Sequence, residues 1–94
     1  MEQNMRKYGY YLYGEKDSYG QAQLSKEVVG EVKMNINVAS QSIQDSVAYS
    51  GTHYVALTNA DINDKMVIQF GDEKLKVLYV NHHGRYKQVF LARM

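Results

Sequence analysis

The chain has 94 residues, a formal net charge of +1 and no cysteine, and hydrophobic residues make up 45% of it. This length predicts one domain spanning residues 1–94, and the near-neutral charge argues against general attraction to nucleic acid or membranes. Disulfide and thiolate sites are excluded, which fits a reducing compartment. The N-terminus lacks a signal-peptide pattern and no stretch approaches the ~20 apolar residues of a membrane span, so we expect cytosolic synthesis and no membrane association.

The first half of the chain predicts two strands separated by a polar loop. Residues 8–13 are rich in tyrosine, which favours a strand, and residues 14–25 are polar and turn-rich. Residues 26–38 alternate between apolar and polar side chains, which predicts one long strand with a single buried face. The residues expected to face the core are Val28, Val32, Met34, Ile36 and Val38.

The segment from Ala39 to Gly51 has no strong period and is dominated by Ser, Gln and Asp. It predicts a long loop with at most one weak helical turn, and loops of this length in small domains are often functional. Residues 52–58 predict a further strand. A connector follows from Asn59 to Asp64, in which Asp61 is placed to cap a short turn.

The last thirty residues predict a three-stranded antiparallel meander. Strands are expected at residues 65–70, 75–80 and 85–91, with turns at 71–74 and 81–84 that contain Gly, Asn and Asp. In a flat sheet, the edge strands would have unpaired backbone N–H and C=O groups, and closure of the sheet into a barrel pairs them. We therefore predict an all-β fold: a small antiparallel β-barrel of five to six strands, with one long loop and at most a short helical turn.

Residues that could support catalysis or metal binding do not form a recognisable pattern. Adjacent histidines in a strand would point to opposite faces, and the sequence places His82 and His83 in a turn, so we interpret them and His53 as polar residues without a metal. The carboxylate pairs Asp72-Glu73 and Asp61/Asp64 fall in turns and connectors, where Asp is a common turn former. No phosphate-binding glycine loop or nucleophile-elbow sequence is present. We predict that the protein is not an enzyme and needs no cofactor.

The C-terminal meander carries a concentration of positive charge. From Lys74 to Met94 there are five basic residues and no acidic one. Tyr79 and Tyr86 are interleaved with the candidate basic face, which consists of Lys74, Lys76, Arg85 and Lys87. Two interpretations stay open: a face that binds nucleic acid, as in small OB-like barrels, or a solvated sheet face whose lysines discourage edge pairing.

Three stretches carry a resemblance to a known family. They are Asp64–Phe70, Leu75–Asn81 followed by Gly84-Arg85, and the early segment Asp17–Gly20. Together they resemble the head–tail connector proteins of tailed bacteriophages, in the small head-completion or stopper class. The matched segments cover roughly the last third of the chain and a short piece near its N-terminus.

The resemblance implies a structural role in the neck of a virion, with assembly in the host cytoplasm. The expected assembly is a homo-oligomeric ring below the portal and adaptor, which closes the DNA-filled head and gives tail-completion proteins a platform. Packaged double-stranded DNA would lie in the ring's channel, and its retention would be steric and electrostatic. By position, the segment from Ala39 to Gly51 matches the family's channel loop, with candidate residues Ser42, Gln44, Asp45, Ser46 and Tyr49. An OB-like module that binds single-stranded nucleic acid stays as the alternative function.

Overall fold

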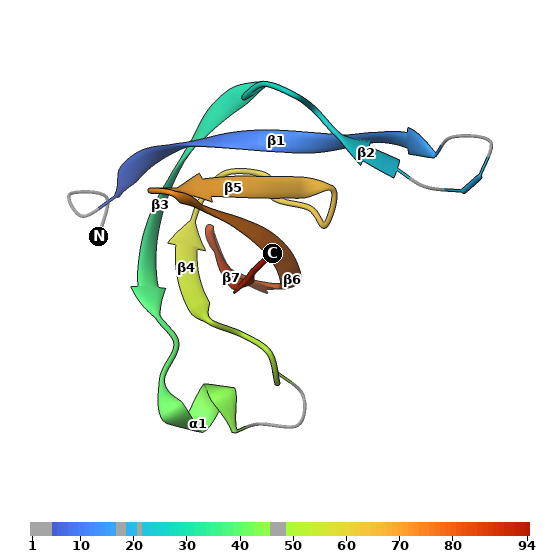
Figure 1. Cartoon of the computed structure of the whole chain (residues 1–94). Coiled ribbons are helices and arrows are strands. Elements are labelled where there is room, and N and C mark those ends of the chain that lie inside the picture. Colours follow the sequence, from blue (N-terminus) through green and yellow to red (C-terminus); the bar gives the residue numbers. More distant parts are fainter. Residues whose placement is uncertain (1–4, 17–18, 21, 46–48) are drawn as a thin grey trace.

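The computed structural model describes residues 5–16, 19–20, 22–45 and 49–94. Within them the chain is almost entirely antiparallel β-strand, with one helical turn (Figure 1). In chain order the elements are β1 (Arg6–Lys16), β2 (Ala22–Leu24), β3 (Gly30–Val38), α1 (Gln41–Gln44), β4 (Tyr54–Thr58), β5 (Met66–Phe70), β6 (Glu73–His83) and β7 (Tyr86–Arg93).

Six of these strands close into a barrel, which confirms the predicted fold class. The neighbours run β1, β3, β4, β7, β6 and β5, and β5 pairs back to β1 through Tyr10 and Ile68. Closure satisfies the backbone groups that an open sheet would expose. The barrel interior is filled by apolar side chains from all six strands and the β4–β5 connector; the most buried are Met34, Tyr54, Ala56, Ile62, Met66, Ile68, Leu75, Val77, Val89 and Leu91.

The long alternating strand is shorter than predicted, and its two ends are exposed. Met34 is fully buried at its centre, and Val32 and Ile36 pack against the core. The core positions predicted for Val28 and Val38 are wrong, because these side chains are 45% and 75% exposed. Alternation fixes the side of the strand on which a residue lies. It does not reveal where burial ends: Val28 precedes β3, and Val38 lies beyond Met34, where the described pairing of β3 with β1 ends.

The polar stretch predicted as a loop at residues 14–25 is largely a two-stranded arm. β1 continues to Lys16, and β2 pairs antiparallel with it, Tyr13 opposite Leu24 and Lys16 opposite Ala22. Figure 1 shows this end of β1 together with β2 extending away from the barrel. In the part of the arm that the structure describes, no side chain is fully buried, and the sequence lacks the alternation that identifies a half-buried strand.

The predicted C-terminal meander is confirmed, but the turn before β7 is shorter than predicted. β6 runs on to His83, so the turn before β7 is reduced to Gly84 and Arg85. Gly84 has φ 64°, in the left-handed region where glycine carries no steric penalty. The predicted turn position of His82 and His83 is therefore wrong: both lie in a strand, opposite Lys87 and Tyr86.

Candidate functional site

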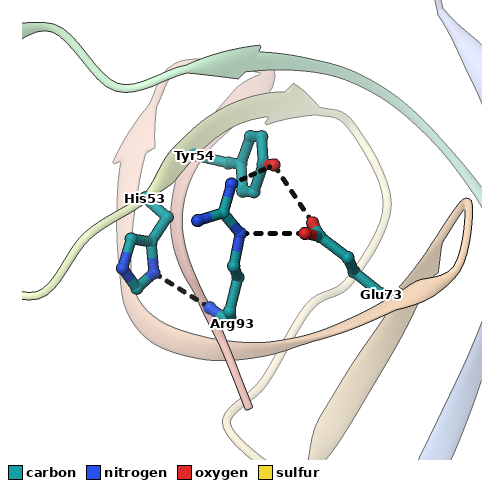
Figure 2. Close-up of polar contacts among 4 residues, drawn as sticks. All are labelled: His53, Tyr54, Glu73 and Arg93. Atoms are coloured by element: carbon teal, nitrogen blue, oxygen red, sulfur yellow. Dashed lines mark hydrogen bonds and ion pairs between the residues drawn. The ribbon is translucent and has the colours of Figure 1, made fainter.

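A polar cluster closes one end of the barrel above a group of aromatic rings. The ring of Phe70 lies 5.0 Å from that of Tyr54 and 5.8 Å from that of Tyr8, between ring centroids. The Tyr54 hydroxyl donates a hydrogen bond to Glu73 Oε2 at 3.1 Å and accepts one from Arg93 Nη2 at 3.0 Å. Arg93 Nε lies 3.0 Å from Glu73 Oε1, which completes a closed triangle of contacts (Figure 2).

The main chain of Arg93 also forms a hydrogen bond. Its N–H donates to His53 Nδ1 at 3.0 Å, so this imidazole nitrogen carries no proton in the bonded state. The hydrogen bond that Arg93 donates to the Tyr54 hydroxyl and, next, the charge of Glu73 raise the pKa of Arg93 above its usual value. The guanidinium therefore stays charged at any physiological pH.

The three side chains of Tyr54, Glu73 and Arg93 form a structural clamp, because they bind one another across three strands. Glu73 and Arg93 neutralise each other, and the Tyr54 hydroxyl is used both as donor and as acceptor. The contacts join β4, the start of β6 and the end of β7, and they add side-chain links to the β-ladders that already pair these segments. An open pocket beside the cluster is lined by Asp72, Glu73, Lys74, Arg93 and Met94.

Changing Tyr54 to Phe tests the clamp. The variant keeps the ring and loses two partly buried hydrogen bonds, so we expect a loss of about 1–2 kcal/mol in the free energy of unfolding. Urea denaturation followed by circular dichroism measures it. Tyr8→Phe is the matched control, because Tyr8 contacts the same Phe70 ring outside the polar triangle, and its midpoint should stay near that of the parent. Equal midpoints for the two variants would contradict the clamp.

A second aromatic group fixes the end of the long loop to the outside of the barrel. The Tyr49 ring stacks on Phe90, with centroids 4.4 Å apart and planes 10° apart, and Tyr79 meets Tyr49 edge-on at 5.6 Å. The Asn81 amide donates to the Tyr49 hydroxyl at 3.3 Å. Phe90 is only 2% exposed although its neighbours Val89 and Leu91 take the positions of the barrel interior, so residues outside the barrel must cover it.

The other end of this loop contains the predicted helical turn, which the structure confirms. Ser40 caps α1, and its hydroxyl accepts the Ile43 N–H at 3.4 Å. Gln41 Nε2 donates to Asp45 Oδ1 at 2.9 Å one turn later. The loop is thus organised locally at its start and anchored by an aromatic stack at its end.

The channel-loop candidates that the structure describes lie in different environments. Ser42 and Asp45 are exposed, and Gln44 is the last residue of α1. Ser46 lies outside the described residues. Tyr49 is half-buried in the aromatic stack and acts as the anchor of the loop.

The four residues of the candidate basic face do not form one continuous surface. Lys74 and Lys76 lie on the outer face of β6, since Leu75 between them is buried, and Lys74 Nζ lies 4.9 Å from the Tyr11 ring centroid. Arg85 is exposed in the β6–β7 turn. Lys87 forms an ion pair with Asp61 at 3.5 Å, and its side chain is 16% exposed. Along β6, about 20 Å of strand separates Lys76 from the position opposite Lys87.

The histidines and acidic residues also have separate positions. Among the described residues there is no group of three or more His, Cys, Asp or Glu side chains that could hold a metal ion. The cap predicted for Asp61 is absent, because its carboxylate pairs with Lys87, and Asn63 Oδ1 instead accepts the Lys65 N–H at 2.9 Å. No helix in the described part of the chain is long and apolar enough to cross a membrane.

No pattern in the sequence predicts the clamp. Glu73 is 19 positions from Tyr54, and Arg93 is 39 positions from it, and neither spacing marks a contact in the sequence. Glu73 was interpreted as a turn residue, whereas it begins β6 and points toward the barrel end. The available signal was weak: Glu73 lies two positions before the buried Leu75 and therefore on the same side of the strand.

Comparison with known proteins identifies a fold that this chain shares. A solved chain from the virion of a native gene transfer agent particle matches 95% of this chain and 94% of its own length, with a TM-score of 0.66 and 15% sequence identity. No protein-family model and no curated protein matches the sequence. The match extends over nearly the whole length of both chains, so the two chains share a fold.

Proposed function

We propose that this chain is a structural component of a phage-like virion. The observation that carries the proposal is the match over nearly the whole length of both chains to a protein of a gene transfer agent virion. The independent resemblance of residues 64–85 to phage connector proteins supports the same class. A closed barrel held by a clamp at one end suits a passive building block better than a site that must open to admit a substrate.

Within that class, we propose a head–tail connector that forms a ring below the portal and closes the DNA-filled head. Two extensions of the barrel support this role. The arm and the α1 segment leave the body in different directions (Figure 1), so neighbouring copies and a central channel can be contacted by different parts of one chain. Anchoring by Tyr49 gives the α1 segment a fixed base, and the exposed Ser42 and Asp45 lie beyond that base.

Replacing residues 42–48 with a short Gly-Ser link, while keeping Tyr49, tests the connector role. Loop-closure entropy varies slowly with length, so the barrel should stay folded, with a melting temperature within a few degrees of the parent. Particles assembled with this variant should package DNA into heads and then leak it, or fail to join tails. Encapsidated DNA and tailed particles can be counted by nuclease protection and electron microscopy. Particles that retain DNA and infect normally would contradict the channel role, and a Ser42→Ala/Asp45→Ala variant with intact loop length separates composition from length.

The alternative, an OB-like module that binds single-stranded nucleic acid, is favoured by one observation: Lys74 and Lys76 share an outer face beside Tyr11. Two phosphate contacts predict a slope of roughly −1.4 in a plot of log affinity against log salt. Fluorescence anisotropy with a single-stranded oligonucleotide measures it. Tight binding with this slope, lost in a Lys74→Glu/Lys76→Glu variant, would favour the alternative over the connector.

A further inference from the structure

His53 links separate segments of the chain at the end of the barrel that carries the clamp. Its main-chain N–H donates to the Leu91 carbonyl at 2.9 Å, and its carbonyl accepts the Ala39 N–H at 3.0 Å. Its imidazole Nδ1 accepts the Arg93 N–H at 3.0 Å (Figure 2). The next residue, Tyr54, belongs to the clamp. His53 therefore connects the residue that follows β3 with the end of β7.

The hydrogen bond from the Arg93 N–H requires a neutral imidazole. A protonated imidazole carries an N–H on both ring nitrogens and has no acceptor left. Protonation of His53 therefore turns Nδ1 into a donor that faces the Arg93 N–H, and the bond between them breaks. His53 is exposed, so solvent can deliver the proton. Because histidine ordinarily takes up its proton between pH 5 and 8, mild acid is enough for this change.

The charges around His53 do not compensate for an added proton. Among the described residues, the titratable groups on the segments that meet at this barrel end are Arg93 on β7, Tyr54 on β4 and Asp72, Glu73 and Lys74 at the start of β6. Residues 39–44, which follow β3, are uncharged. Glu73 already bonds to Arg93 and Tyr54 through its two carboxylate oxygens. An imidazolium at His53 therefore adds positive charge beside Arg93, whose guanidinium stays charged.

We propose that His53 is an acid-sensitive latch for the C-terminal end of β7. At neutral pH the imidazole holds the main chain of Arg93, which keeps the Arg93 side chain in place for the clamp. Below about pH 6.5, where a free histidine takes up its proton, the bond is lost and the end of β7 is released from His53. A hydrogen bond to the neutral ring opposes protonation, so the stabilisation is complete above this pH and decreases as the pH falls. The latch belongs to the barrel itself and does not depend on the proposed connector role.

Replacing His53 with Asn tests the latch. The Oδ1 atom of Asn lies at nearly the same distance along the side chain as Nδ1 of histidine, and it accepts a hydrogen bond at every pH. His53→Ala removes the acceptor altogether. The Arg93 amide proton resonance, followed by NMR from about pH 7.5 to about pH 5, reports the bond directly. In the parent it should move toward its position in His53→Ala as the pH falls, whereas in His53→Asn it should stay unchanged.

Urea denaturation over the same pH range gives the second readout. The remaining histidines and the carboxylates titrate in the parent and in His53→Asn alike, so the difference between the two proteins isolates His53. The unfolding equilibrium constant should rise on acidification about twofold to tenfold more in the parent, which is the size of one hydrogen bond. Equal changes in the two proteins would overturn the latch. A parent titration in which the His53 ring resonances shift while the Arg93 amide stays fixed would overturn it even if the variants failed to fold.

Discussion

Replacing Met34 with Asp should unfold the barrel. Met34 is fully buried in the middle of β3, within the apolar cluster that fills the interior. The substitution removes a large core side chain, which alone costs about 2–5 kcal/mol, and leaves a carboxylate without a partner in an apolar site. A domain of this size has roughly 5–10 kcal/mol of total stability, so the sum is enough to abolish folding. Circular dichroism and amide dispersion in NMR spectra at 25 °C would report the loss.

Val38→Asp is the matched control for that variant. Val38 lies on the same strand and at the same parity as Met34, yet it is 75% exposed. The expected change in the free energy of unfolding is within about 0.5 kcal/mol of the parent. If both variants unfolded, the barrel would extend further along β3 than the structure shows. If neither did, Met34 would not lie in the core.

Changing Tyr49 to Ala should release the long loop from the barrel. The variant loses the stack on Phe90, the edge contact with Tyr79 and the hydrogen bond from Asn81. Since the ring is half-buried, we expect a loss of about 2–3 kcal/mol, below the cost of removing a fully buried aromatic. Hydrogen exchange should increase most at the Thr52 amide, which bonds to the Tyr49 carbonyl, with little change in the barrel strands.

Tyr49→Phe separates the contribution of the Tyr49 ring to stability from the contribution of its hydroxyl. It keeps the stack and loses one hydrogen bond at 3.3 Å, so its stability should fall by about 1 kcal/mol or less. Should Tyr49→Ala prove as stable as Tyr49→Phe, the loop would be held by other contacts and Tyr49 would not be its anchor. In the connector role, Tyr49→Ala should also weaken DNA retention in particles, because a channel loop without a fixed base cannot hold its position.

The anchor and the clamp divide the molecule into a rigid body and two extensions. The clamp of Tyr54, Glu73 and Arg93 holds one barrel end, and the stack of Tyr49 on Phe90 holds the base of the loop. In the proposed connector role, the barrel would form the body of each ring subunit, and the two extensions would meet neighbouring molecules.

The sequence by itself determined the all-β class and the C-terminal meander. These features are local: Gly71 and Gly84 occupy left-handed turn positions, and β-rich runs of suitable length lie between them. The centre of β3 could also be predicted, because apolar residues at every second position, Val32, Met34 and Ile36, indicate a strand with one buried face. The weak helical turn after residue 39 was also predicted, and it is α1.

Only the tertiary structure decided where the barrel ends and which distant residues meet. Val28 and Val38 continue the alternating pattern but are exposed, and no local signal marks where burial ends along this segment. The arm could not be predicted from the sequence, because strands that are exposed on both faces show no alternation of apolar and polar residues. The clamp joins residues 19 and 39 positions apart, and Tyr49 reaches Phe90 across the outside of the sheet. Contacts of this kind depend on how the closed barrel brings its strands together, which no single segment of the chain encodes.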